Sequence, residues 1–196
     1  MLKAALQFII LVGTVVGLRA SDNPVKMLTV CEVFADVDHY AGNAIAIIGR
    51  MESSVSLIDH YEFLSQDHCK RRIVAHGHVW PGKIQVWTFS MEEGMPKPPT
   101  DKPTLDRAVV AAKLATGRKT TKLGAHHEPS RDLRGRPSTA LVPNQWVVVY
   151  GRIVRSPHLD EDCGRSICSG FDAPLIVIAY PDQIHVIRDD GTLRHD

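Results

Sequence analysis

The stretch Ala44-Ile45-Ala46-Ile47-Ile48-Gly49-Arg50-Met51 decides the fold that this chain is expected to adopt. A run of apolar residues that includes several isoleucines is typical of a buried β-strand. Gly49 interrupts the run, and a glycine within a strand marks a bend or the close approach of another segment. The similar stretch Val149-Tyr150-Gly151-Arg152-Ile153 places a glycine in a later strand. Two strands that bend at glycine predict a small curled β-barrel.

Further strands are predicted on both sides of these two stretches. The residues Trp80-Pro81-Gly82-Lys83 place Pro and Gly where a type II turn prefers them, which predicts a hairpin between the apolar segments on either side. The expected strands, in chain order, are residues 44–57, 61–64, 72–80, 83–89, 146–154 and 175–180, with residues 183–187 continuing the sheet.

Two helices are expected between the strands. Thr29 and Glu32 form the Ser/Thr-x-x-Glu pattern of a capping box, which predicts a helix that begins there and ends at Gly42. A second helix is expected up to Gly117, with Thr104 as its cap. The predicted fold is therefore mostly β with one or two helices, in the order helix, three strands, helix, two strands. That order matches the five-stranded OB-like barrel.

The N-terminal part of the chain resembles a known group of proteins. The residues Val30-Cys31-Glu32-Val33, followed by Tyr40-Ala41-Gly42 and a strand that ends at Gly49, are similar to the opening of uncharacterised secreted bacterial proteins with an OB-fold-like domain. The resemblance implies an OB-like barrel and an exported protein. It implies no catalytic residue.

The first twenty residues are expected to be a signal peptide. Lys3 precedes the apolar stretch Ala4–Leu18, and polar residues follow Ala20. The stretch is shorter than the roughly twenty residues that a membrane span needs, so no transmembrane span is expected in the mature protein. A retained anchor and a buried helix are the weaker interpretations. Residues 21–196 are then one OB-like domain with a long basic loop at about 118–144.

The four cysteines fit an oxidising compartment, where they would form disulfides. Of the three possible connectivities, Cys163–Cys168 together with Cys31–Cys69 is favoured, because the first pair closes a short loop and the second ties the first helix to a distant segment. A zinc site is disfavoured, because the only close pair has the spacing Cys-x₄-Cys.

A basic segment raises the question of polyanion binding. The whole chain has 23 Lys and Arg against 22 Asp and Glu, which excludes a general attraction to nucleic acid or anionic membranes. Residues 97–136 nevertheless carry a net charge of +6. The segment is expected to be a solvated loop, and its alternative role is binding of a polyanion or of single-stranded nucleic acid. The candidate contacts are Trp80 and Trp87 for stacking and Arg131, Arg134 and Arg136 for phosphates.

The remaining chemistry favours binding over catalysis. His76 and His78 would face the same side of a strand and could share a metal ion, so a metal-dependent enzyme is one alternative. No third ligand is evident, and signatures of common hydrolases, zinc proteases and dinucleotide enzymes are absent from the sequence. The sequence therefore predicts a secreted, non-catalytic binding or envelope-associated module without a cofactor. It names neither the partner nor the oligomeric state.

Overall fold

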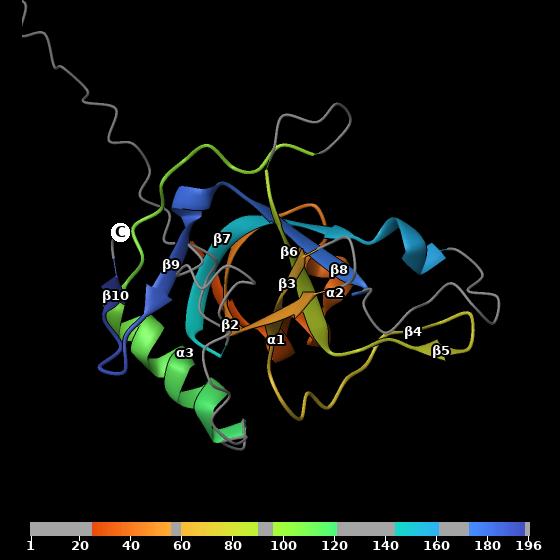
Figure 1. Ribbon diagram of the computed structural model, residues 1–196, viewed down its shortest axis with the longest axis horizontal. Helices are drawn as coiled ribbons and strands as arrows, with labels where there is room; N and C mark the ends of the chain where they lie inside the picture. The colour runs from red at the N-terminus through yellow and green to blue at the C-terminus, as the bar shows by residue number, and fades with distance from the viewer. Residues whose placement is uncertain (1–24, 56–59, 90–95, 121–143, 161–172, 195–196) are drawn as a thin grey trace, which may run out of the picture.

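A closed five-stranded β-barrel forms the centre of the molecule (Figure 1). Its strands pair in the order β2-β3-β6-β8-β7 and back to β2; β6 and β8 are parallel, and the other pairs are antiparallel. This arrangement confirms the OB-like barrel that the sequence predicts. The computed structural model describes residues 25–55, 60–89, 96–120, 144–160 and 173–194. The barrel strands are β2 (Ala44–Val55), β3 (His60–Ser65), β6 (Lys83–Thr88), β7 (Trp146–Arg155) and β8 (Leu175–Ala179).

The two glycines of the similar stretches lie where β2 and β7 change pairing partner. Strand β2 pairs with β7 up to Arg50 and with β3 from Arg50 onward. Strand β7 pairs with β2 up to Arg152 and with β8 from Arg152 onward. A Cβ on Gly49 would lie 2.9 Å from Val30 Cγ2, and one on Gly151 would lie 2.6 Å from the Ile178 carbonyl oxygen. Glycine therefore permits the close approach that closes the barrel.

The chain enters the barrel through strand β1 (Met27–Thr29), which pairs in parallel with β2, and then forms helix α1 (Val30–Ala35). The predicted capping box is confirmed. The Glu32 N–H donates to Thr29 Oγ1 at 3.3 Å, and the Thr29 N–H donates to Glu32 Oε2 at 2.7 Å. The predicted single helix up to residue 41 is wrong, because Asp36 leaves helical geometry with φ −151° and a second short helix, α2 (Val37–Tyr40), follows.

The barrel has a core on each side of its wall. The interior is filled by apolar side chains of the strands, and Val30, Val33 and Phe34 of α1 complete it. Helix α3 (Arg107–Thr120) packs on the outside, where Val110 and Leu114 contact a second apolar cluster. The cluster contains Met27, Ala46, Ile48, Val148, Tyr150 and Ile187.

Helix α3 begins later than the sequence predicts. Its cap is Asp106 and not Thr104: Asp106 Oδ1 accepts hydrogen bonds from the backbone N–H of Ala108 at 2.7 Å and of Val109 at 3.4 Å. Aspartate is at least as good an N-cap as threonine, and it stands next to the first helical residue.

The predicted hairpin of residues 72–80 and 83–89 is also wrong. Strand β6 has both of its edges occupied by β3 and β8 within the closed barrel, so it has no free edge for a hairpin partner. Instead, β4 (Val74–Ala75) and β5 (His78–Val79) form a separate two-stranded hairpin. Its turn is His76-Gly77, where both residues have positive φ, as a two-residue type I′ turn requires.

The C-terminal segment widens the sheet beside the barrel. Strand β9 (Ile184–Ile187) pairs with β7, which confirms the predicted continuation at residues 183–187. A further strand, β10 (Leu193–Arg194), pairs with β9. Two short 3₁₀ helices, η1 (Pro157–Asp160) and η2 (Pro181–Gln183), lie on either side of β8 in the sequence.

Candidate functional site

A cleft of about 470 Å³ lies between the start of α3 and strands β7, β9 and β10. Apolar side chains line part of it, among them Leu105 and Leu193. Polar groups line the rest, namely Lys102, Thr104, Arg107, Tyr150, Asp182, Gln183 and His185. A concave site with apolar walls and a few convergent polar groups is typical of a small-molecule site.

Tyr150 is held in the wall of the cleft by one defined hydrogen bond. Its side chain leaves the β7 strand within the apolar cluster under α3, and its hydroxyl donates to Asp101 Oδ2 at 2.9 Å. Burial, together with the hydrogen bond and the charge of Asp101, raises the pKa of Tyr150 to about 12. Tyr150 therefore presents a neutral hydroxyl.

The segment before α3 is tied down by Gln183 and by an ion pair. The Gln183 side chain is buried, donates to the Pro99 carbonyl at 2.5 Å and accepts from the Tyr180 N–H at 2.9 Å. Lys102 Nζ lies 2.8 Å from Asp182 Oδ2. Their hydrogen bond raises the pKa of Lys102 and lowers the pKa of Asp182. The cleft is therefore preformed, with both of these groups charged.

Arg107 differs from Lys102, because no ion pair joins it to a described residue. It is exposed at the first position of α3. The lining of the cleft therefore keeps one guanidinium whose charge is not balanced by a carboxylate of the described chain.

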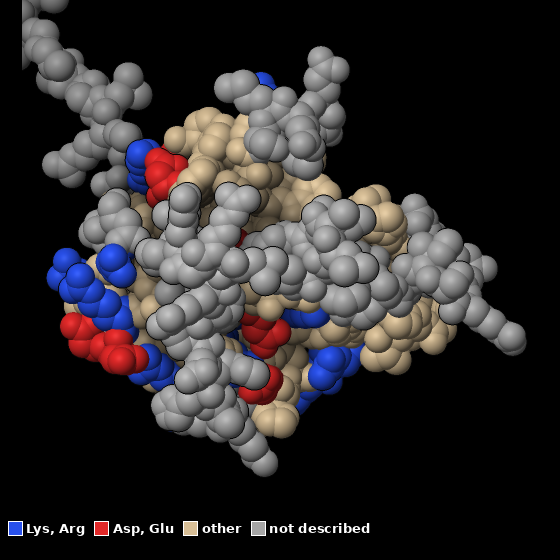
Figure 2. All heavy atoms as spheres, in the orientation of Figure 1, with Lys and Arg blue, Asp and Glu red and all other residues tan. Residues whose placement is uncertain are grey.

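Three of the six described cations of the basic segment 97–136 form ion pairs. These ion pairs attach α3 and the segment before it to η2, to α1 and to the segment after β9. The expectation of a solvated loop did not include such attachments. On the face drawn in Figure 2, several of the visible Lys and Arg side chains lie beside Asp and Glu side chains. The pairs are Lys102–Asp182 at 2.8 Å, Lys113–Glu32 at 2.5 Å and Arg118–Asp189 at 3.3 Å.

A second hollow, of about 440 Å³, lies at the other end of α3. Arg118, Arg188 and Arg194 line it together with Asp189 and Trp146. The Trp146 indole occupies the space beside Gly117, where a Cβ would lie 2.7 Å from the ring.

The two tryptophans proposed for stacking do not form a platform together. Trp80 is only 1% exposed, so its ring is unavailable to a base. Trp87 lies half-buried on β6, and the hairpin that was expected to join the two residues is absent.

His76 and His78 do not share a strand face. His76 is in the turn with φ +50°, and only His78 belongs to β5, where its ring makes an edge contact with Trp80 at 5.1 Å between centroids. Within the described ranges, no three side chains of His, Cys, Asp or Glu are grouped so that they could hold a metal ion.

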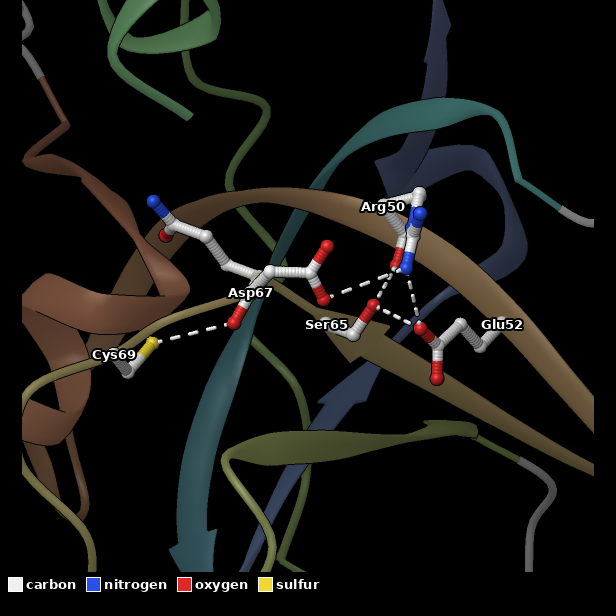
Figure 3. A network of polar contacts seen from close by, with 6 residues as sticks. Arg50, Glu52, Ser65, Asp67 and Cys69 are labelled. Carbon is white, nitrogen blue, oxygen red and sulfur yellow. Dashed lines mark hydrogen bonds and ion pairs between the residues drawn. The ribbon is translucent and has the colours of Figure 1, made fainter. Parts of the chain in front are cut away.

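The disulfide between Cys31 and Cys69 is confirmed, and it joins α1 to the segment after β3 across 38 residues of sequence. The same segment is joined to the barrel by a polar network (Figure 3). Arg50 Nη2 lies 3.0 Å from Glu52 Oε1 and 3.7 Å from Asp67 Oδ1. The Ser65 hydroxyl also donates to Glu52 Oε1, at 2.6 Å.

Several predicted features lie outside the described residues. They are the signal peptide at residues 1–20, the pair Cys163 and Cys168, and Arg131, Arg134 and Arg136 of the basic segment.

Fold and site together define an OB-like barrel with a preformed cleft on the side covered by α3. Comparisons with protein families, with curated proteins and with solved structures found no match to this chain. Among the described residues, none of the helices combines the length and the apolar character needed to cross a lipid bilayer.

Proposed function

We propose that this protein is an exported, non-catalytic binding module, and that the cleft beside Tyr150 holds its ligand. The observation that carries the proposal is a preformed cleft with apolar walls and convergent polar groups. Catalytic acids and bases need pKa values near the working pH. The pKa shifts resolved in this cleft lead away from neutral pH, since the pKa values of Tyr150 and Lys102 are raised and that of Asp182 is lowered.

The lining favours a small anionic ligand with an apolar part. Arg107 offers a guanidinium without a carboxylate partner in the described chain, and guanidinium groups bind carboxylates and phosphates well. Leu105 and Leu193 offer apolar contact beside it. The Tyr150 hydroxyl, whose proton is donated to Asp101, can accept a hydrogen bond from an N–H or O–H of the ligand.

Export is supported by two separate features. The apolar stretch at residues 4–18 follows Lys3 and precedes a polar run, which is the pattern of a signal peptide. The Cys31–Cys69 disulfide fits an oxidising compartment, where such bonds persist.

A titration with two matched probes, benzoate and benzamide, tests the ligand class. We expect benzoate to shift the backbone amide NMR signals of residues 102, 104–107, 150 and 182–185. Arg107→Gln should weaken benzoate binding about fivefold, the equivalent of one partly exposed charge-assisted contact, and should leave benzamide binding unchanged.

Lys119→Gln is the matched control, because Lys119 is an exposed cation at the far end of the same helix. It should not change binding of either probe. Signal changes that avoid the cleft, or equal effects of the two substitutions on benzoate, would refute the assignment of this cleft.

A further inference from the structure

The hairpin of β4 and β5 exposes two apolar side chains. Among the described residues the two strands pair only with each other, with Val74 opposite Val79, and the hairpin extends away from the barrel (Figure 1). Val74 is 64% exposed and Val79 is 59% exposed, the highest values among the large apolar side chains of the described chain. Because they are direct cross-strand neighbours, they form one apolar patch.

The opposite face of the hairpin already provides its attachment to the protein. Alternation along the strands places Ile73, Ala75, His78 and Trp80 on that face. The Trp80 side chain is buried, the Trp80 backbone N–H donates to the Ile73 carbonyl at 2.9 Å, and Ile73 packs on the barrel core. An outward strand face is ordinarily polar, so the valine pair marks a contact surface.

The hairpin is fixed at its base. On one side, Cys69 is bonded to Cys31 and Asp67 lies beside Arg50 (Figure 3). On the other side, Trp80 is buried. The hairpin that carries the apolar patch is therefore anchored to the barrel at both of its ends.

Four cations surround the base of this hairpin, and residues 67–83 carry a net charge of +3. Arg71 donates to the Ala35 carbonyl at 2.7 Å, and Lys83 Nζ lies 4.1 Å from the centre of the Phe63 ring. Neither contact neutralises a charge. No ion pair joins any of the four to a residue of the described ranges. The cations are Lys70, Arg71, Arg72 and Lys83.

We propose that this hairpin docks the protein onto a lipid bilayer that carries anionic headgroups. Val74 and Val79 enter the interface between headgroups and acyl chains, while the cations at the base contact lipid phosphates. Apolar insertion combined with basic residues is how peripheral proteins bind anionic membranes. The proposal uses no residue of the Tyr150 cleft, so either can fail without the other.

Sedimentation with lipid vesicles tests the docking. We expect the protein to bind vesicles of phosphatidylcholine mixed with phosphatidylglycerol, to bind phosphatidylcholine alone much more weakly, and to dissociate as salt rises. Val74→Thr combined with Val79→Thr should weaken binding about tenfold, because the hydroxyls oppose insertion. Threonine keeps the β-branched shape, so the hairpin is retained. Lys70→Gln combined with Arg72→Gln should weaken binding about 25-fold, at about fivefold per cation.

Val109→Thr and Lys119→Gln are matched controls on α3, with an exposed valine and an exposed lysine far from the hairpin in sequence. Both should bind vesicles like the unsubstituted protein. The proposal is overturned if the protein ignores phosphatidylglycerol, or if the valine variant binds unchanged. Release by millimolar inorganic phosphate at constant ionic strength would also overturn it, because that result indicates a site for a soluble anion.

Discussion

Gly151 shows how a single residue governs the closure of the barrel. It lies one residue before the point where β7 exchanges β2 for β8 as its neighbour, and the main chain of β8 passes directly over it. The nearest atom to a Cβ at this position would be a backbone oxygen, that of Ile178, and backbone in a central strand cannot move aside as a flexible side chain can.

Gly151→Ala should therefore destabilise the protein by about 1–3 kcal/mol, the range for overpacking that forces backbone to shift. The measurement is urea denaturation followed by circular dichroism. Gly82→Ala is the matched control, because a Cβ there would meet only the Arg72 guanidinium at 3.5 Å, an ordinary contact. Equal stability of the two variants would contradict the close approach at Gly151.

At the scale of elements, the two helices are linked through one carboxylate. Glu32 of α1 closes the capping box with Thr29 and also accepts from Lys113 Nζ of α3 at 2.5 Å. Burial raises the pKa of Glu32, but the hydrogen bonds from Lys113 and Thr29 and the charge of Lys113 outweigh it and lower the pKa overall.

Glu32→Gln should remove the charge and keep the capping box, since Gln also serves at that position. We expect a loss of about 1 kcal/mol near neutral pH, modest because the pair is partly exposed. A folded-state pKa below the unfolded value gives stability that is present above the unfolded pKa and is lost as pH falls through the folded pKa. The difference between variant and parent should therefore vanish in acid, as measured by urea denaturation across pH. Lys119→Met is the control and should change stability little at any pH. A constant difference at every pH would show that the charge is not the cause.

Elements with strong local patterns could be predicted from the sequence. The Thr29–Glu32 box and the run at residues 44–51 depend on neighbours in the chain, and the structure confirms both. The hairpin predicted at Trp80-Pro81 was wrong because strand pairing there depends on distant segments and not on neighbours in the chain. Its turn residues are locally suitable, but the neighbours of β6 are set by barrel closure, which no short stretch reveals.

At the scale of the whole molecule, the Cys31–Cys69 disulfide connects the helix that completes the barrel core to the base of the projecting hairpin. The loop that it closes spans 38 residues of sequence and includes β2 and β3. Cross-linking such a loop restricts the unfolded chain more than the folded one.

Cys31→Ala combined with Cys69→Ala should lower the free energy of unfolding by about 3–4 kcal/mol, the value for a loop of this length in the chain-entropy description. The check is denaturation of the variant beside the parent protein. A reductant should have much less effect on the variant than on the parent. Unchanged stability of the variant would contradict a structural role for this bond.

The candidate cleft was not predicted because it assembles residues from distant parts of the chain. Tyr150 reads as an ordinary strand residue, and its partner Asp101 lies 49 residues earlier. In the sequence, Lys102 belongs to a basic segment that is expected to be solvated, whereas in the structure it forms an ion pair with Asp182. Only the positions of β7, β9 and the start of α3 in the fold bring these groups together.

The parallel pairing of β6 with β8 imposes an order in time. Strand β6 ends at residue 88 and β8 begins at residue 175. One edge of β6 therefore stays unpaired until β8 has been synthesised. A chain that emerges from the ribosome cannot complete its barrel until β8 has been synthesised. Contacts between such distant segments slow folding and prolong the exposure of an unpaired strand edge. The unpaired edge of β6 is therefore a feature of every partly synthesised chain that lacks β8.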